Sequence, residues 1–270
     1  MSKQIGFIGA GNMGKAIIAG IIASGQVAAS DIHVFDLQQS QVDDLVARFG
    51  VRGAASAAEV AAQADILFAA VKPNVITQVL ADLAPRLKAG GILVSIAAGV
   101  TLASLAAAVG AERKVVRVMP NTPALVNAGM SSLTANANVN AAEVAEVVAL
   151  LESFGRAEVV PESLIHAVTA VSGSAPAYVF MFIEAMADAA VLGGMPRAQA
   201  YQFAAQTVLG SAKMVLESGQ HPGALKDMVC SPGGTTIEAV KVLEDKGLRA
   251  GVMEAMLQCM RKSEAMSQSK

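Results

Sequence analysis

Three glycines near the start of the chain have the spacing of a loop that binds phosphates. Gly9, Gly11 and Gly14 form the pattern G-x-G-x-x-G, which follows the apolar run IGFI and opens a segment with helical periodicity. In such a loop the first glycine permits a tight turn, the second lets a pyrophosphate approach the backbone, and the third lets helix and strand pack closely. Free N–H groups at the start of the helix would then face the phosphates. The pattern predicts a dinucleotide site rather than a purely structural glycine turn.

A second candidate anion site lies in the sequence SPGGTT, residues 231–236. Its first four residues must interrupt the preceding helix, because proline lacks an N–H and glycine tolerates positive φ. Thr235 and Glu238 have the spacing of a capping box, which predicts that a new helix begins there. Two interpretations remain at this point. The break is either an ordinary turn, or a place where bare backbone and two hydroxyls hold an anion at a helix N-terminus.

Polar residues follow other predicted strands, at the edge where a parallel sheet would bind a cofactor. Asp36 ends the run IHVFD, where an acidic residue would bind the adenosine ribose and repel a 2′-phosphate; this favours NAD over NADP. The alternative is a solvated loop carboxylate. Lys72 and Pro73 follow another strand in AVKPN, and Asn121 stands between two prolines in VMPNTPA. The Asn121 amide could face nicotinamide or substrate, or could only close the strand as an Asx turn.

The elements that would position these residues alternate regularly as far as about residue 160. Short apolar runs separated by helical pattern predict strands at 5–9, 32–36, 66–71, 92–96 and 114–119. Continuous apolar strands that alternate with helices indicate a parallel sheet covered on both faces. Two more apolar segments would add edge strands on either side of a predicted helix at 141–155; they span residues 131–135 and 157–160.

After Pro161 the strand signals stop and the pattern becomes entirely helical. The predicted helices span residues 163–193, with a disturbance at 172–176, then 197–218, 222–229, 235–245 and 247–266. Too many of their positions are apolar for one thin layer to cover, so we expect a bundle that buries one face against a second subunit. The alternative is a monomeric helical domain. The change of pattern predicts two domains, residues 1–160 and 161–270.

Composition narrows the class of protein. The chain has 270 residues, 54% of them hydrophobic and 16% charged, with a formal net charge of −2. No nucleic-acid partner is expected, because phosphate contacts need clustered Lys and Arg. Two cysteines and three scattered histidines have no metal-ligand spacing, so we expect no metal, and reduced thiols in a cytoplasmic protein.

Membrane and export signals are also not expected. Glycines and Lys15 interrupt the N-terminal segment before a signal-peptide core could form. Two uncharged runs, residues 92–111 and 164–183, are long enough to raise the question of a membrane span. Both contain strand-end or helix-break residues, which are typical of buried segments in soluble proteins.

Together these motifs resemble those of the pyrroline-5-carboxylate reductases, a family that reduces a cyclic imine in the last step of proline biosynthesis. The resemblance covers essentially the whole chain: GFIGAGNMG, AVKP, SIAAGV, MPNTPA, VSGSAPAY, GGMPR, and HPGALKDMV before SPGGTT, the most specific motif. It implies an α/β Rossmann domain followed by an all-α dimerisation domain. It also implies homodimers, which in the family often assemble as five dimers, with sites shared between subunits. The implied cofactor is NADP(H), and Asp36 keeps NAD(H) as the alternative.

With the glycine motif and Asp36, the resemblance gives a set of expected site residues. The cofactor-binding residues are Ile8, Gly9, Ala10, Gly11, Asn12, Met13, Gly14, Asp36, Ala70, Val71, Lys72, Pro73 and Asn121. The substrate-binding residues are Ser231, Gly233, Gly234, Thr235 and Thr236. A substrate with one carboxylate favours the anion interpretation of SPGGTT, since a helix N-terminus suits a negative charge. We expect Thr236 Oγ1 to hydrogen-bond the ring nitrogen, and assign Thr236 as the catalytic residue.

Other functions remain as alternatives. The β-hydroxyacid dehydrogenases, which also join a Rossmann domain to helices, use a lysine on the first interdomain helix to handle a hydroxyl proton. Residues 163–196 contain no Lys or Arg, which favours an imine over an alcohol or ketone as substrate. Reduction of another small cyclic imino acid remains possible by the same chemistry. A catalytically silent dinucleotide-binding scaffold or redox sensor is the alternative from a different class, and for it the SPGGTT loop would be dispensable.

Overall fold

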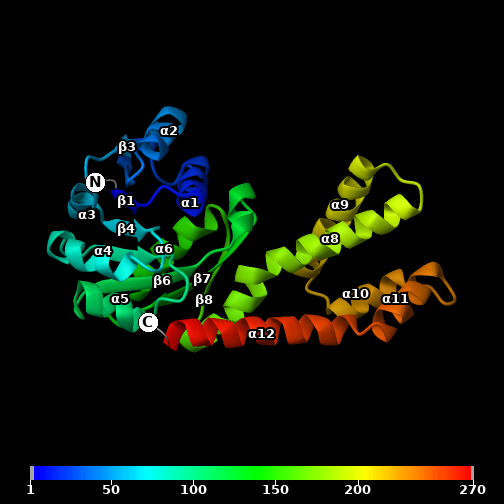
Figure 1. Ribbon diagram of the computed structural model, residues 1–270. Coiled ribbons are helices and arrows are strands. Elements are labelled where there is room, and N and C mark those ends of the chain that lie inside the picture. The colour runs from blue at the N-terminus through cyan, green and yellow to red at the C-terminus, as the bar shows by residue number, and fades with distance from the viewer. Residues whose placement is uncertain (1–2, 269–270) are drawn as a thin grey trace. The chain divides into compact units, whose positions relative to one another are not determined.

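One eight-stranded sheet organises the N-terminal part of the chain (Figure 1). The computed structural model describes residues 3–268. The strands are β1 (Ile5–Ile8), β2 (Ile32–Phe35), β3 (Arg52–Gly53), β4 (Ile66–Ala69), β5 (Ile92–Ser95), β6 (Lys114–Met119), β7 (Gly129–Ala135) and β8 (Gly155–Val159). They pair in the order β3-β2-β1-β4-β5-β6-β7-β8, parallel except for the antiparallel pair β6–β7. All seven predicted strands are present; the two-residue β3 was not predicted.

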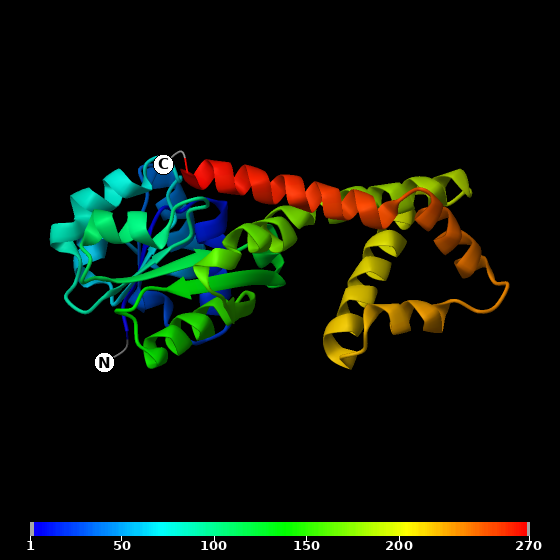
Figure 2. The same cartoon turned by 90° about the horizontal axis from the view of Figure 1, so that it is seen from below.

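Helices cover both faces of this sheet (Figure 1 and Figure 2). One face packs against α1 (Asn12–Ala23), α2 (Gln39–Phe49) and α6 (Ala141–Glu152), and the other against α3 (Ala57–Gln63), α4 (Ile76–Leu83) and α5 (Leu102–Val109). Short 3₁₀ turns connect some elements: η1 (Ala29–Asp31), η2 (Ala84–Arg86) and η3 (Thr122–Val126). The rings of Phe7 and Phe68 stack in the first core with centroids 4.8 Å apart. The predicted α/β fold of this half is confirmed.

The chain divides into two compact units, and the first does not end with the sheet. Residues 3–174 and 259–268 form the first unit, and Ala175–Gln258 the second. After β8 the first unit continues through η4 (Glu162–Leu164), α7 (Ile165–Val168) and the π-helix η5 (Thr169–Ser174). Ile165 and Ala170 of this segment are buried. The boundary at residue 160 lies just after the last strand, and as a domain boundary it stays a prediction.

The second unit is helical, as predicted. It contains α8 (Ala175–Leu192), α9 (Arg197–Ser218), α10 (Pro222–Val229), α11 (Thr235–Asp245) and the first part of α12 (Leu248–Gln268). Helices α8 and α9 pack closely because Ala187, Ala200 and Ala204 lie buried between them. The break predicted at 172–176 is the π-helix that precedes α8.

Large apolar side chains remain exposed on the second unit. Phe180 is 62% exposed, Leu192 91% and Phe203 64%, and α11 and α12 add exposed valines, leucines and methionines. A soluble monomer seldom leaves apolar patches of more than a few hundred Å² uncovered. The surface of these helices therefore needs a covering partner.

The two uncharged runs differ in structure. Residues 92–111 contain strand β5 and helix α5, so they are no continuous helix. Glu162–Leu192 is one helical run that is long and apolar enough to cross a membrane by length and composition alone, with 11% of its most apolar window buried. A single helix of this kind among the described residues is weak grounds for a membrane span, since length and composition alone identify it.

His33 makes the stability of the first unit depend on pH. It lies on β2, 6% exposed, with Nε2 2.8 Å from Gln4 Oε1. Burial lowers its pKa below the ordinary value, and nearby Arg52 adds to this effect. The unfolded chain therefore takes up the proton at higher pH than the folded chain does. We expect the free energy of unfolding to fall as the pH drops through about 6.5.

Denaturant unfolding at one fixed protein concentration, between about pH 7.5 and pH 5.5, measures this loss. His33→Gln keeps a polar partner for Gln4 and should flatten the pH dependence. Equal slopes for the wild type and His33→Gln would contradict the assignment.

Candidate active site

The loop between β1 and α1 has the geometry that the glycine motif predicts. Gly9 has a φ of 101°, and a Cβ built on it would lie 2.5 Å from the Ala70 carbonyl oxygen, so only glycine fits. At Gly11, by contrast, a Cβ would meet no atom within 4 Å, which leaves space for a ligand. Gly11 is also the N-cap of α1, and no side chain caps this helix. The first-turn N–H groups are therefore available to a phosphate.

Asp36 fixes the same loop from the end of β2. Its Oδ2 accepts a hydrogen bond from the Ala10 N–H at 2.6 Å, and its Oδ1 accepts one from the Gln38 N–H at 2.8 Å. A carboxylate oxygen has more than one acceptor site, so these bonds leave capacity for a ribose hydroxyl. Sequence spacing did not predict that Asp36 would also hold the glycine loop.

A cleft of about 360 Å³ opens where β1, β4, β5 and β6 end. Eight of the predicted cofactor residues line it: Gly11, Asn12, Met13, Gly14, Ala70, Val71, Lys72 and Pro73. Five lining residues were not predicted: Ile96, Ala97, Ala98, Met119 and Pro120. They follow or end β5 and β6, and the rule that ligands bind at the carboxyl ends of parallel strands would have found them.

The other predicted cofactor residues do not line this cleft. Ile8 and Ala10 are 3% and 0% exposed, so they can offer only backbone groups to a ligand. Asn121 is 9% exposed; its Nδ2 donates to the Ser172 carbonyl at 3.0 Å and its Oδ1 accepts from the Met130 N–H at 2.8 Å. Both ends of the amide thus bind the protein's own backbone. A direct contact between Asn121 and a cofactor stays a prediction.

The SPGGTT segment forms a tight turn that leads directly into α11. The Gly234 N–H donates to the Ser231 carbonyl at 3.0 Å, and Gly233 has a φ of 66°. This is the pattern of a type II turn, with Pro232 and Gly233 at its two central positions. A Cβ on Gly234 would lie 2.4 Å from Ser231 Oγ, so a larger residue there would require the Ser231 hydroxyl to turn away.

The predicted capping box at Thr235 and Glu238 is wrong. Gly234 is the N-cap of α11, with an extended backbone (φ −84°, ψ 172°), and no side chain caps the helix. Thr235 is already inside the first turn, so its hydroxyl is not at the N-cap position that a capping box needs. The absence of a side-chain cap favours the anion interpretation, because the N–H groups of the first turn of α11 have no side chain to bind them. Thr235 is exposed and Thr236 half-buried at this helix start.

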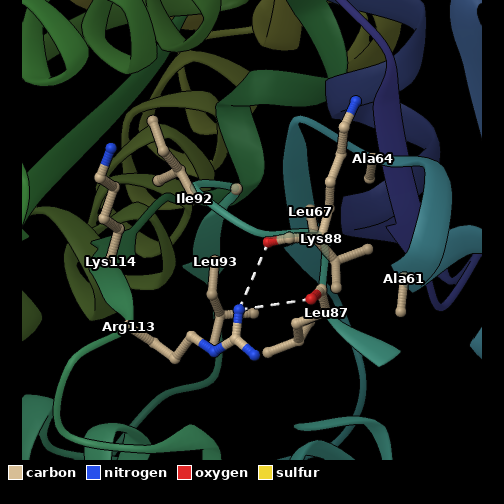
Figure 3. Close-up of a pocket in the computed structure, with 10 residues that line it drawn as sticks. Ala61, Ala64, Leu67, Leu87, Lys88, Ile92, Leu93, Arg113 and Lys114 are labelled. Atoms are coloured by element: carbon tan, nitrogen blue, oxygen red, sulfur yellow. Dashed lines mark hydrogen bonds between the residues drawn. The ribbon is translucent and has the colours of Figure 1, made fainter. Parts of the chain in front are cut away.

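Another hollow in the first unit is too small to serve as a substrate site. It has a volume of about 10 Å³, enough for one water at most, between the start of β5 and the loop after η2 (Figure 3). The Arg113 guanidinium closes it by donating to the carbonyls of Leu87 and Lys88 at 3.3 and 3.4 Å (Figure 3). Among residues 3–268, no group of three or more His, Cys, Asp or Glu side chains could hold a metal ion.

Family profiles match both halves of the chain. The profile "Pyrroline-5-carboxylate reductase dimerisation" matches residues 162–266. The profile "NADP oxidoreductase coenzyme F420-dependent" matches residues 4–99, which contain the glycine loop and Lys72.

Whole-chain comparisons agree with these profiles. The pyrroline-5-carboxylate reductase of Escherichia coli strain K12 is 64% identical over 269 residues, covering 100% of each chain. The solved enzyme from Coxiella burnetii is 34% identical, with a TM-score of 0.94 over 99% of each chain. A Plasmodium falciparum pyrroline carboxylate reductase, solved with NADP bound, is also 34% identical, with a TM-score of 0.88 over 98% of each chain. The chain belongs to the pyrroline-5-carboxylate reductase family.

Proposed function

We propose that this protein reduces 1-pyrroline-5-carboxylate to L-proline with NADPH, the last step of proline biosynthesis. The observation that carries the proposal is the likeness along the whole chain to enzymes of that name. Two features of the chain account for the chemistry: the cleft beside the glycine loop and the uncapped start of α11.

The turn before α11 binds the substrate. 1-Pyrroline-5-carboxylate is a small cyclic imine with one carboxylate. The N–H groups and positive end of a helix suit that carboxylate, and Ser231, Gly233, Gly234 and Thr235 present hydroxyl groups and bare backbone beside it. We assign Thr236 Oγ1 to the ring nitrogen, since Thr236 is the second residue of the helix.

The cleft binds the dinucleotide. The open space at Gly11 and the uncapped α1 fit a pyrophosphate, and Asp36 marks the adenosine side of β1. The ends of β5 and β6, on the other side of β1, then receive the nicotinamide. When bound, NADPH supplies the hydride for the imine carbon. A protonated imine is already an electrophile, so the residues of the site mainly position it.

The cofactor is NADP(H), and the predicted contacts to it are part of the proposal. The backbone of Ile8, Gly9 and Ala10, the lining residues of the cleft, and Asp36 form the binding set. The negative charge of Asp36 disfavours a 2′-phosphate, so we expect NADH to be accepted as well.

The apolar surface of the second unit is covered by a second copy of the chain. Phe180, Leu192 and Phe203 are exposed on helices within the segment that matches the dimerisation profile. The ion pairs Asp188–Arg197 and Lys213–Glu217 lie on the same helices, α8 and α9, and are out of place in lipid. We propose a cytoplasmic dimer that assembles further, as five dimers, with active sites completed between subunits.

Nicotinamide absorbance tests the reaction and the role of Thr236 together. The wild type should oxidise NADPH rapidly when 1-pyrroline-5-carboxylate is added, and NADH in a parallel assay. Thr236→Ala should lower kcat roughly 10²-fold, because the imine loses a group that positions it. Its Kd for NADPH should stay unchanged, since the cofactor cleft is intact.

Thr77→Ala is the matched control, because Thr77 is an exposed threonine and also the second residue of its helix, α4. It should turn over like the wild type. Folded wild-type protein that binds NADPH but oxidises neither cofactor would sink the reductase assignment and favour the scaffold alternative. Normal turnover by Thr236→Ala would remove only the role of Thr236.

Asp36→Asn should raise preference for NADPH. At about 4 Å, two like charges repel by about 1 kcal/mol even in water, so the ratio of kcat/KM for NADPH to that for NADH should rise roughly fivefold or more. Asn keeps one carbonyl oxygen for the Ala10 N–H. Gln39→Ala, an exposed neighbour, should leave the ratio as it is. An unchanged ratio in Asp36→Asn means that Asp36 does not discriminate between the cofactors.

Phe180→Asp should weaken the assembly. A charge on this exposed α8 position would be buried without a partner in the dimer, which is costly. Size-exclusion chromatography with light scattering should show a shift towards smaller species on dilution. Leu37→Asp, at a 93% exposed leucine of the first unit, is the control and should keep the wild-type mass. Equal masses for all three proteins would mean that α8 is outside the interface.

A further inference from the structure

The carbonyl of Ser172 has no ordinary helical donor. In an α-helix each carbonyl accepts from the N–H four residues later, and four residues after Ser172 is Pro176, which has no N–H. The chain forms the π-helix η5 here, and the Ser172 carbonyl accepts from Asn121 Nδ2 at 3.0 Å. Asn121 Nδ2 thus donates where the N–H of residue 176 is missing.

Further hydrogen bonds fix this arrangement. Asn121 Oδ1 accepts from the Met130 N–H at 2.8 Å, so the amide joins the end of β6 to β7 as well as to η5. The Thr169 hydroxyl donates to the Ile165 carbonyl at 2.8 Å, and the Ser172 hydroxyl to the Val168 carbonyl at 3.0 Å. Both bonds satisfy carbonyls in the turn before the π-helix. A buried polar group without a partner is costly. The bond between Asn121 and Ser172 therefore fixes the position of η5 relative to the end of β6.

The π-helix borders the cleft through Met119. A Cβ built on Gly173 would lie 2.7 Å from Met119 Cε, so the backbone of η5 packs against this side chain. Met119 lines the cleft at the end of β6. Asp36 at the end of β2 lies on the adenosine side, so Met119, on the other side of β1, lies on the nicotinamide side. Single π-helical turns are frequent at functional sites.

We propose that Asn121 is a positioning residue for the reduction. It holds η5 against Met119 and so fixes the wall of the cleft where nicotinamide and imine meet. Asn121 does this through its bonds to Ser172 and Met130, without touching the substrate. The inference rests on the proposed function, because it requires hydride transfer at this end of the cleft.

Asn121→Ala tests the role in turnover. We expect kcat to fall roughly tenfold to a hundredfold, as displacements of about 1 Å at a reacting centre do. The Kd for NADPH should change far less than kcat, because the glycine loop that binds the pyrophosphate is untouched. The primary isotope effect on kcat, with NADPH deuterated at the transferred position, should rise as hydride transfer becomes slower. A merely structural role would reduce the amount of folded enzyme and leave the isotope effect unchanged.

Asn136→Ala is the matched control, because it also removes an asparagine whose amide joins two backbone segments. The Asn136 amide also bridges two backbone groups, the Arg113 carbonyl at 2.8 Å and the Val115 N–H at 3.1 Å, beside the first residues of β6 and far from the cleft. It should lower stability without changing the isotope effect. Should Asn121→Ala fail to fold, Asn121→Asp is the second variant. It keeps an acceptor oxygen for the Met130 N–H and replaces the NH₂ group that donates to Ser172 with an oxygen. We expect the same changes in kcat and in the isotope effect.

Pro176→Ala tests the missing donor itself. Alanine restores an N–H for the Ser172 carbonyl, so Asn121→Ala should destabilise the Pro176→Ala protein less than it destabilises the wild type. If the losses in the free energy of unfolding caused by Asn121→Ala and Pro176→Ala are additive, Asn121 does not compensate for the missing N–H. Wild-type kinetics and isotope effect in folded Asn121→Ala and Asn121→Asp overturn the positioning role alone. Absence of turnover by the wild type overturns the proposed function and this inference with it.

Discussion

A helix that starts without a side-chain cap has N–H groups in need of an acceptor, and both anion sites of this protein depend on that constraint. Glycine is the N-cap of α1 and of α11. Side chains cap α3, α5, α6 and α10 through Ser56, Thr101, Asn140 and His221, whereas α2, α4 and α9 start without such a cap but have no glycine at the N-cap. The sheet and the turn at residues 231–234 present the uncapped starts to solvent. Their unmet hydrogen-bonding capacity is what a pyrophosphate and a carboxylate can satisfy.

Polar side chains at the strand ends form hydrogen bonds with the protein's own backbone. Asp36 binds the glycine loop, and Asn121 binds the π-helix. Met119, Pro120 and the alanines after β5 then form a largely apolar cleft wall. Such a wall has few groups that could exchange protons with a bound imine. This composition suits a reaction in which the substrate arrives activated and needs accurate placement.

The sequence was informative where local rules decide the structure. Continuous apolar runs predicted seven strands, and proline and glycine gave the bounds of α10 and α11. The capping box failed because turn geometry put Gly234, rather than Thr235, at the N-cap. The partner of Asn121 could not be predicted, since Ser172 is 51 residues away and the bond depends on tertiary packing. The side chain of Met119 carries no chemical signal of a cleft, so only its position at the end of a predicted strand could have identified it.

The return of α12 to the first unit bears on how the chain matures on the ribosome. The side chains of Ser263 and His166 form a hydrogen bond, and so do those of Cys259 and Ser174. The unit that contains the sheet is therefore completed by residues synthesised after the whole of the second unit. Domains that are contiguous in sequence can fold in order of emergence. Here the nascent sheet must wait with part of its α7–η5 surface open until the final helix is released. A chaperone that covers that surface would protect it during the wait, whereas slow translation after residue 174 would lengthen its exposure.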